Sequence, residues 1–371
     1  MAMKTKMRPI KTLLLSIFIG LFLPCLIQAH SSFTQKDATQ AIDAFHEAFY
    51  NPDMKLYSTD SNKKGRAAIW TQAIYWDMIM NAYKRTKNEK YRRLIDEIYQ
   101  GGYEQYTGYD WTDKHEWFIY DDMMWWIISL ARAYEITGDG KYLDKASNGF
   151  FYVWEEAYDK DRGGFWWNFI HDAKMACINY PATVAAMTLY NITQDPDYLE
   201  KAKSVYTWSR NVFFDDKQGR IADNMHYNHL FKNSMDIAWV TQLYNQGTFI
   251  GAATMLYKAT NNKSYLQDAV LAADYVKGNM CYADGILEFK TGIEQGIYAA
   301  IFAQYIAMLI EDGKQTQYLD WLKHNINTAW NNRNKKRNLT FKDAVKPCPE
   351  GVIEVYDASG CPALMQLIPN K

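Results

Sequence analysis

Asp121 and Asp122 are adjacent carboxylates where a polar segment leads into an apolar run, and the surrounding residues 117–126 read WFIYDDMMWW. Like charges a few ångströms apart resist joint ionisation, and flanking rings that exclude water increase that resistance. One member of the pair is therefore expected to keep its proton, as glycosidic bond cleavage requires of one of its two carboxyl groups. In the alternative interpretation, Asp121 caps a helix and Asp122 interacts with the helix dipole.

Side chains suited to sugar binding occur in other segments. Trp166 and Trp167 follow two glycines in a loop pattern, and a tryptophan ring offers an apolar face with a polar edge. We predict that one or both contact a ligand, the alternative being that a ring plugs the interior of the fold. Asn179, Asn245 and Gln246 offer neutral donors and acceptors of the kind that sugar hydroxyls need, although each alone is typical of a cap or loop anchor.

The sequence predicts no cofactor and no metal site. His226 and His229 have a spacing seen in metal sites, but no third ligand is evident. Residues 159–163 faintly resemble a calcium loop and lack the downstream bidentate acid, so a turn is the better interpretation. No glycine-rich phosphate loop and no serine nucleophile elbow occur.

Residues 1–29 are predicted to be a signal peptide, because basic residues precede an apolar run from 13 to 27 and Ala29 offers a cleavage point. A membrane anchor is the alternative, but the run is short for a spanning helix. Residues 30–371 are then one secreted or periplasmic domain. Loss of the four basic residues in the peptide changes the net charge from −1 to −5. No basic block remains that could hold a phosphate backbone, which argues against nucleic acid. Cys348 and Cys361 either pair or remain buried thiols.

A helical repeat runs through the chain. An apolar stretch ends in a short Thr, Gly, Asp or Asn turn, and an amphipathic stretch then begins with a tyrosine. The aligned tyrosines are Tyr91, Tyr142, Tyr198, Tyr265 and Tyr318. Apolar inner helices alternating with amphipathic outer ones predict a closed double ring of helical hairpins, completed by a helix over residues 39–50. Residues 331–349 are interpreted as a surface excursion.

The repeat also predicts where function lies. Connections within hairpins are short, whereas those between hairpins are long, so the long ones gather at one end of the ring. Loops on a rigid scaffold commonly carry binding residues. Asp121 and Asp122 belong to that end, together with residues 163–168, 178–181 and 244–247.

These motifs together resemble glycoside hydrolase family 76, the α-1,6-mannanases. The most specific element is residues 120–126 leading into 131–139, supported by residues 163–167, 178–179 and 244–247. The resemblance implies an all-α fold, an (α/α)6 barrel of inner and outer helices. It also implies endo-hydrolysis of α-1,6-mannan with retention of configuration.

The same resemblance assigns roles to single residues. Asp121 matches the nucleophile and Asp122 the general acid/base. Four residues match the lining of the substrate cleft: Asn179, Tyr244, Asn245 and Gln246. One departure is Gln295, which stands where the family often has lysine.

Two further functions stay open at this point. One is another enzyme on the same scaffold, such as a mannan transglycosylase or an unsaturated glucuronyl hydrolase. The other is a non-catalytic mannan-binding protein. The loops offer mostly Trp, Tyr, Asn and Asp, which favours a neutral sugar. The expected partner is α-mannan, and the expected state is a monomer.

Overall fold

Helices make up most of the chain in the computed structural model, which describes residues 32–227, 235–292 and 294–370. The long helices are α1 (Gln35–Phe49), α2 (Ile69–Thr86), α3 (Glu89–Gln105), α4 (Tyr120–Thr137), α5 (Gly140–Ala157), α6 (Ala176–Thr193), α7 (Pro196–Phe213), α8 (Leu243–Thr260), α9 (Lys263–Asn279), α10 (Gln295–Glu311) and α11 (Leu319–Asn331). The shorter elements are β1 (Tyr50–Asn51), β2 (Leu56–Tyr57), β3 (Ala173–Met175), β4 (Asn224–Tyr227), β5 (Met235–Ala238), the 3-10 helix η1 (Thr316–Tyr318), α12 (Val355–Ala358) and α13 (Gly360–Leu367).

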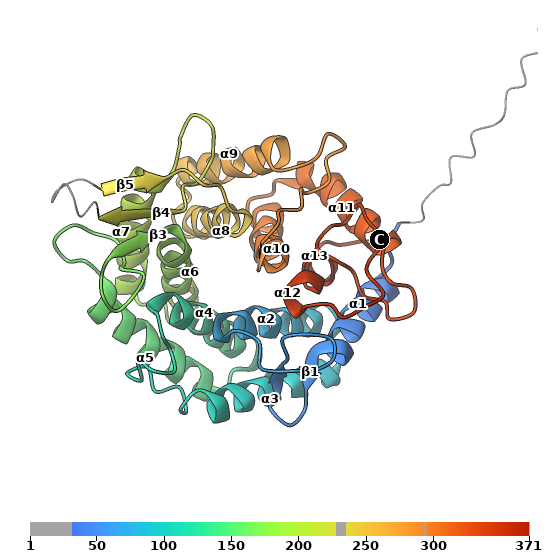
Figure 1. Ribbon diagram of the computed structural model, residues 1–371. Helices are drawn as coiled ribbons and strands as arrows, with labels where there is room; N and C mark the ends of the chain where they lie inside the picture. Colours follow the sequence, from blue (N-terminus) through green and yellow to red (C-terminus); the bar gives the residue numbers. More distant parts are fainter. Residues whose placement is uncertain (1–31, 228–234, 293, 371) are drawn as a thin grey trace, which may run out of the picture. The chain divides into compact units, whose positions relative to one another are not determined.

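The helices form two concentric rings (Figure 1). In the inner ring, consecutive members pack side by side in the order α2, α4, α6, α8, α10 and α13, and α13 packs back against α2 to close it. The outer ring consists of α3, α5, α7, α9, α11 and α1. The predicted all-α (α/α)6 barrel is therefore confirmed.

The sixth pair of inner and outer helices brings together the two ends of the domain. The N-terminal helix α1 packs against α13, and the Gln366 side-chain amide donates a hydrogen bond to the Ala38 carbonyl (2.9 Å). The sequence predicts α1 but not α13, because the eight residues of α13 carry no copy of the repeat. The interpretation of residues 331–349 as a surface excursion is wrong in part, since Leu339 and Cys348 are buried.

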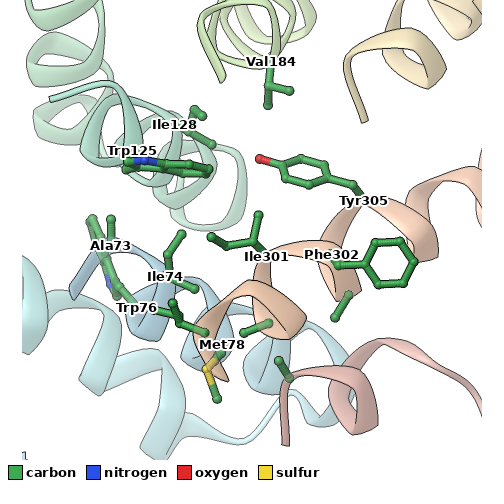
Figure 2. Close-up of a cluster of buried hydrophobic side chains, with 14 of the residues drawn as sticks. Ala73, Ile74, Trp76, Met78, Trp125, Ile128, Val184, Ile301, Phe302 and Tyr305 are labelled. Atoms are coloured by element: carbon green, nitrogen blue, oxygen red, sulfur yellow. The ribbon is translucent and has the colours of Figure 1, made fainter. Parts of the chain in front are cut away.

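The inner helices are apolar on all sides because both of their faces are covered. Figure 2 shows Ile74 of α2, Trp125 of α4 and Ile301 of α10 converging on one region of the barrel interior, and all three are buried. Side chains thus fill this part of the barrel. The chemistry of a barrel filled in this way has to lie at one of its ends.

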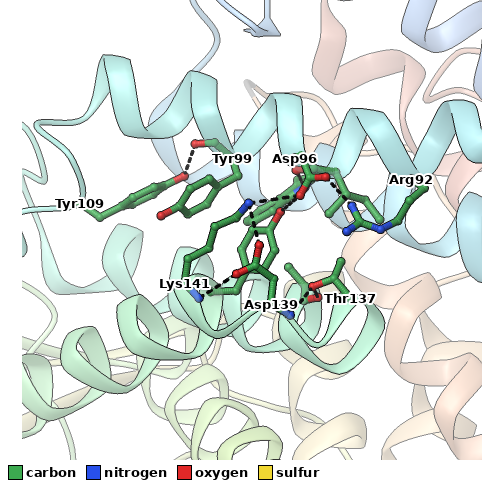
Figure 3. Close-up of polar contacts among 11 residues, drawn as sticks. Arg92, Asp96, Tyr99, Tyr109, Thr137, Asp139 and Lys141 are labelled. Carbon is green, nitrogen blue, oxygen red and sulfur yellow. Dashed lines mark hydrogen bonds and ion pairs between the residues drawn. The ribbon is translucent and has the colours of Figure 1, made fainter.

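The repeat is explained by capping and by contacts between outer helices. The inner helices α2, α4, α6 and α8 end at a left-handed residue, and the outer helix that follows each begins with a side-chain cap, as at Gly138 and Asp139. Lys141 of α5 forms an ion pair with Asp96 of α3 (3.4 Å) and a second one with Asp139 (Figure 3). The Tyr142 hydroxyl donates to the same Asp96. The repeat tyrosines Tyr91 and Tyr318 make the equivalent bond to Asp43 and Asp274 of the preceding outer helices (2.6 and 2.8 Å).

Two of the long connections meet in a small antiparallel sheet. β3, from the connection between α5 and α6, pairs with β4 from the connection between α7 and α8, and β4 pairs with β5. The sheet holds these two connections beside each other directly before α6 and α8. The first turns of these inner helices are thereby fixed at the same end of the barrel.

The predicted signal peptide, residues 1–29, lies outside the described residues. Within residues 32–227, 235–292 and 294–370, no helix is long and apolar enough to cross a membrane. Cys177, Cys281, Cys348 and Cys361 are free thiols, so the alternative of a Cys348–Cys361 disulfide is not realised.

Candidate active site

The aspartate pair lies in the first turn of α4. The helix begins after Ile119, which makes no side-chain cap, and Asp121 and Asp122 are 8% and 7% exposed. Neither aspartate therefore occupies the N-cap position that the capping interpretation gave to Asp121. Burying two carboxylates on neighbouring residues lowers the stability of the fold, and such groups are found mainly where a function requires them.

The loop before β3 holds Trp167 against this pair. The backbone carbonyl of Trp167 accepts a hydrogen bond from the Tyr120 N–H (3.2 Å). The backbone N–H of Trp167 donates to the Ala173 carbonyl (2.9 Å). The Trp167 indole N–H donates to Asp121 Oδ2 at 3.3 Å. A half-buried tryptophan beside the carboxylate pair is in a position to contact a bound sugar.

The side chain of Trp166 packs against His171 and Lys174, away from the aspartate pair. Its ring stacks on His171 (centroids 5.4 Å apart, interplanar angle 4°), and Lys174 Nζ lies 4.5 Å from the ring centroid. The residue is 9% exposed. Of the two predicted tryptophans, the structure places Trp167 at the aspartates and packs Trp166 within its own loop.

Asn179 and Gln246 are fully buried, and their amides bond to backbone groups. Asn179 accepts the Phe165 N–H (2.7 Å) and donates to the Phe165 and Met175 carbonyls. Gln246 accepts the Ile221 N–H (2.6 Å) and donates to the Gly219 and Ala272 carbonyls. Both side chains anchor the connections that frame the site. This is the loop-anchor role expected from sequence as the alternative to sugar binding.

Replacing Asn179 by alanine is expected to lower the free energy of unfolding by about 2–4 kcal/mol, because the buried Phe165 N–H and two carbonyls lose their partner. Thermal or urea unfolding measures this loss. Asn191→Ala, an exposed change near the other end of α6, is the matched control and should cost less than about 0.5 kcal/mol. Equal losses in the two variants would contradict the anchoring role.

Tyr244 and Asn245 form a second wall of the site, at the start of α8. Gly247 allows this wall to approach α10, since an added Cβ would lie 2.8 Å from Phe302 Cα. The rings of Tyr244 and Tyr298 consequently pack with centroids 4.3 Å apart. Asn245 donates to Asp223 Oδ1 (2.9 Å), and its own Oδ1 is buried without a partner in the described structure.

Four residues of this region were not assigned to the site from sequence: Cys177, Asp223, Glu294 and Tyr298. Burial raises the pKa of the Cys177 thiol well above its usual range, so it remains a neutral donor beside Asp121 and Tyr244. The charge of Asp223 acts on both Cys177 and Tyr244, and Tyr298 packs against the Tyr244 ring as a neutral phenol. Their sequence signal is position: Cys177, Glu294 and Tyr298 lie at or near the start of an inner helix, and Asp223 lies directly before β4.

The electrostatics separate the two aspartates. Burial raises the pKa of Asp121 to about 7, while donors from Cys177, Trp167 and Trp125 stabilise its ionised form. Burial and the charge of Asp121 raise the pKa of Asp122 well above its ordinary value. The first proton therefore leaves Asp121, and Asp122 keeps its proton. An ionised and a protonated carboxyl group side by side can act as nucleophile and acid.

Gln295 faces a different space from the aspartates. It lines a cavity of 80 Å³ between α10, α11 and α13, together with Leu243, Phe289 and Lys342. That volume holds only about two or three water molecules. No cluster of three or more metal-ligating side chains occurs in the part of the chain that the structure describes, and His229 lies outside it.

Comparison with known proteins places these features in context. The model of glycosyl hydrolase family 76 matches residues 34–355. The α-1,6-mannanase GH76A of Salegentibacter sp. HEL1_6 has a TM-score of 0.82 at 24% identity, over 90% of this chain and 98% of that one. An inactive variant of that enzyme, with two adjacent aspartates replaced by alanine, has been solved with α-1,6-mannotetrose; it gives the same TM-score of 0.82, identity of 24% and coverage of 90% and 98%.

A family 76 mannosidase from Bacteroides thetaiotaomicron is also similar, with a TM-score of 0.78 at 18% identity over 90% of this chain and 96% of that one. No curated protein sequence is similar enough to this chain to count as a relative.

Proposed function

The chain belongs to glycosyl hydrolase family 76, and from this premise we propose that it is a retaining endo-α-1,6-mannanase. The observation that carries the proposal is the buried pair Asp121 and Asp122 in the first turn of an inner helix. The Salegentibacter enzyme loses activity when two adjacent aspartates are replaced, and it binds an α-1,6-mannooligosaccharide. That parallel supports both the reaction and the substrate class.

In the proposed reaction, the ionised Asp121 attacks the anomeric carbon of a mannose unit. Asp122 donates its proton to the departing O6 oxygen, so the glycosidic bond breaks and a mannosyl ester of Asp121 forms. Asp122, now ionised, takes a proton from a water molecule as the water oxygen attacks the same carbon, which breaks the ester bond and releases Asp121 as a carboxylate. Two inversions give net retention, and each carboxyl group returns to its starting state.

The surrounding side chains fit this division of labour. The Trp167 indole and the Cys177 thiol act on Asp121 and favour its negative charge before attack. Tyr244 and Asp223 offer polar groups to sugar hydroxyls from the opposite wall, and the fully buried Asn245 holds Asp223 in place. We further propose that the protein is exported, on the basis of the signal-peptide pattern in residues 1–29.

Incubation with unbranched α-1,6-mannan is expected to release short α-1,6-mannooligosaccharides, and the products should first appear as α-anomers by NMR. Chromatography of the early products distinguishes endo-cleavage from release of single mannose units. With a short α-1,6-mannooligosaccharide as substrate, products longer than that substrate would indicate transfer in place of hydrolysis. Tight mannan binding without any cleavage would contradict an enzymatic role.

A further inference from the structure

The site contains a third carboxylate, Glu294, directly before α10. The residue is half-buried, and its backbone φ is +70°. Non-glycine residues seldom adopt this left-handed conformation, so the surrounding structure must hold it there. Other left-handed residues of the described chain, such as Lys87 and Gln194, end inner helices, whereas Glu294 stands at the start of one.

The start of α10 is held by close packing against α12. A Cβ added at Gly296 would lie 2.5 Å from the Tyr356 carbonyl oxygen, so only glycine allows this approach. The Ile297 N–H donates to the Glu294 carbonyl (3.1 Å), which begins the helix at this point. Backbone contacts therefore fix where the Glu294 side chain leaves the chain.

Two tryptophans link Glu294 to the aspartate pair. Burial raises the pKa of Glu294, and the indole of Trp70, in the first turn of α2, bonds to the carboxylate and offsets part of that rise. The ring of Trp70 lies 6.1 Å from that of Trp125 on α4, whose side chain acts on Asp121. Glu294 thus belongs to the same cluster as the two aspartates.

The charge of Glu294 raises the pKa of groups that are all acidic or neutral. They are Tyr75 on α2, Asp121 and Asp122 on α4, Tyr298 on α10 and Tyr356 on α12. The pKa of each of these tyrosines is raised, so they stay uncharged. On α12, Asp357 is already paired with Lys342 (2.9 Å). The negative charge of Glu294 is therefore felt by the aspartates without compensation from these groups.

We propose that Glu294 is a positioning residue for the aspartate pair, and that its negative charge holds the proton on Asp122 until the glycosidic bond breaks. This inference rests on the proposed function. Three carboxyl groups in one cluster, two of them buried and the third half-buried, cannot all ionise at neutral pH. The charge of Glu294 raises the pKa of both aspartates, but the donors around Asp121 favour its ionised form, so Asp122 is the group that keeps its proton.

Glu294→Gln tests the proposal, because glutamine keeps the shape and removes the charge. The pH profiles of kcat and kcat/KM on α-1,6-mannooligosaccharides are expected to move to lower pH by about one unit, with both limbs shifted in the same direction. Glu288→Gln is the matched control: this glutamate is exposed in the same connection, and its profile should not move. A profile that keeps its position while kcat falls at every pH would overturn the proposal, since a structural role alone predicts that result.

A second measurement does not depend on activity. Burial raises the folded-state pKa of both aspartates, so the wild-type protein loses stability as the pH rises, and Glu294 adds to that loss. The decrease in Tm from pH 5 to pH 8 is expected to be smaller in Glu294→Gln than in wild type and in Glu288→Gln. An identical decrease in all three would overturn the proposal. Absence of wild-type activity on mannan would instead remove the proposed function, and the Tm comparison would still decide the effect of the charge.

Discussion

Replacing Asp121 or Asp122 by asparagine is expected to reduce kcat on α-1,6-mannan by on the order of 10³-fold or more. Asparagine at position 121 cannot form the covalent intermediate, and asparagine at position 122 cannot donate a proton to the departing oxygen. The double variant should lose little more than the worse single variant, because the two groups act as one unit. Product release measured over hours by chromatography gives sufficient range.

The same substitutions are expected to stabilise the fold. Asp121 has a folded-state pKa of about 7 against an ordinary value of 3.8, so its ionisation costs stability as the pH rises through that window. Full ionisation corresponds to a penalty of up to about 4 kcal/mol, which asparagine does not incur. The Tm of Asp121→Asn should exceed that of wild type at pH 8, and the difference should shrink towards pH 4.

The chain supplies its own control in a second aspartate doublet, Asp215 and Asp216. Asp216 is exposed, so Asp216→Asn should change neither kcat nor the pH dependence of Tm. Loss of activity accompanied by loss of stability in the Asp121 and Asp122 variants would point to a structural role for the pair. Retained activity in either variant would contradict the assigned chemistry.

Much of the barrel could be predicted because its repeat has a local physical cause. The turn at Gly138 and Asp139 combines a left-handed stop with a side-chain cap, and both residue types are visible in sequence. The last inner helix escaped prediction for the opposite reason. Residues 360–367 are held by tertiary contacts with α1 and α10 rather than by a turn and cap of their own.

The site was predictable where its signal is a motif and unpredictable where it is packing. Asp121, Asp122 and Trp167 stand in recognisable local patterns, and the structure brings them together. Asn179 and Gln246 carry the right chemistry for sugars, but their partners are backbone groups of distant connections, which the sequence does not reveal. Glu294 acts on the aspartates through its charge, and its position depends on the packing of α10 against α12.

A buried ion pair inside the barrel predicts the second large effect, this time on stability alone. Arg132 Nη1 lies 2.7 Å from Asp77 Oδ2, and both side chains are almost buried. Arg132 also donates to Asn81 (2.7 Å), which in turn donates to Gln304 of α10 (2.8 Å). Arg132 is about 16 Å further along α4 than Asp121, so the network is remote from the chemistry.

Arg132→Met is expected to lower the free energy of unfolding by about 3–5 kcal/mol, because it leaves the Asp77 carboxylate buried without its cation. Burial already raises the pKa of Asp77 even with Arg132 present, so the loss should be smaller at pH 5, where Asp77 can take up a proton, than at pH 8. Urea unfolding at the two pH values measures both effects.

Two further variants separate the ion pair from the packing around it. Adding Asp77→Leu to Arg132→Met removes the orphaned charge, and the double variant should regain at least about half of the lost stability. Lys258→Met breaks an exposed pair with Asp312 (2.8 Å) and should cost less than about 1 kcal/mol. If the double variant were no more stable than Arg132→Met, the loss would come from packing and the bond to Asn81, and the unpaired charge would not be its cause.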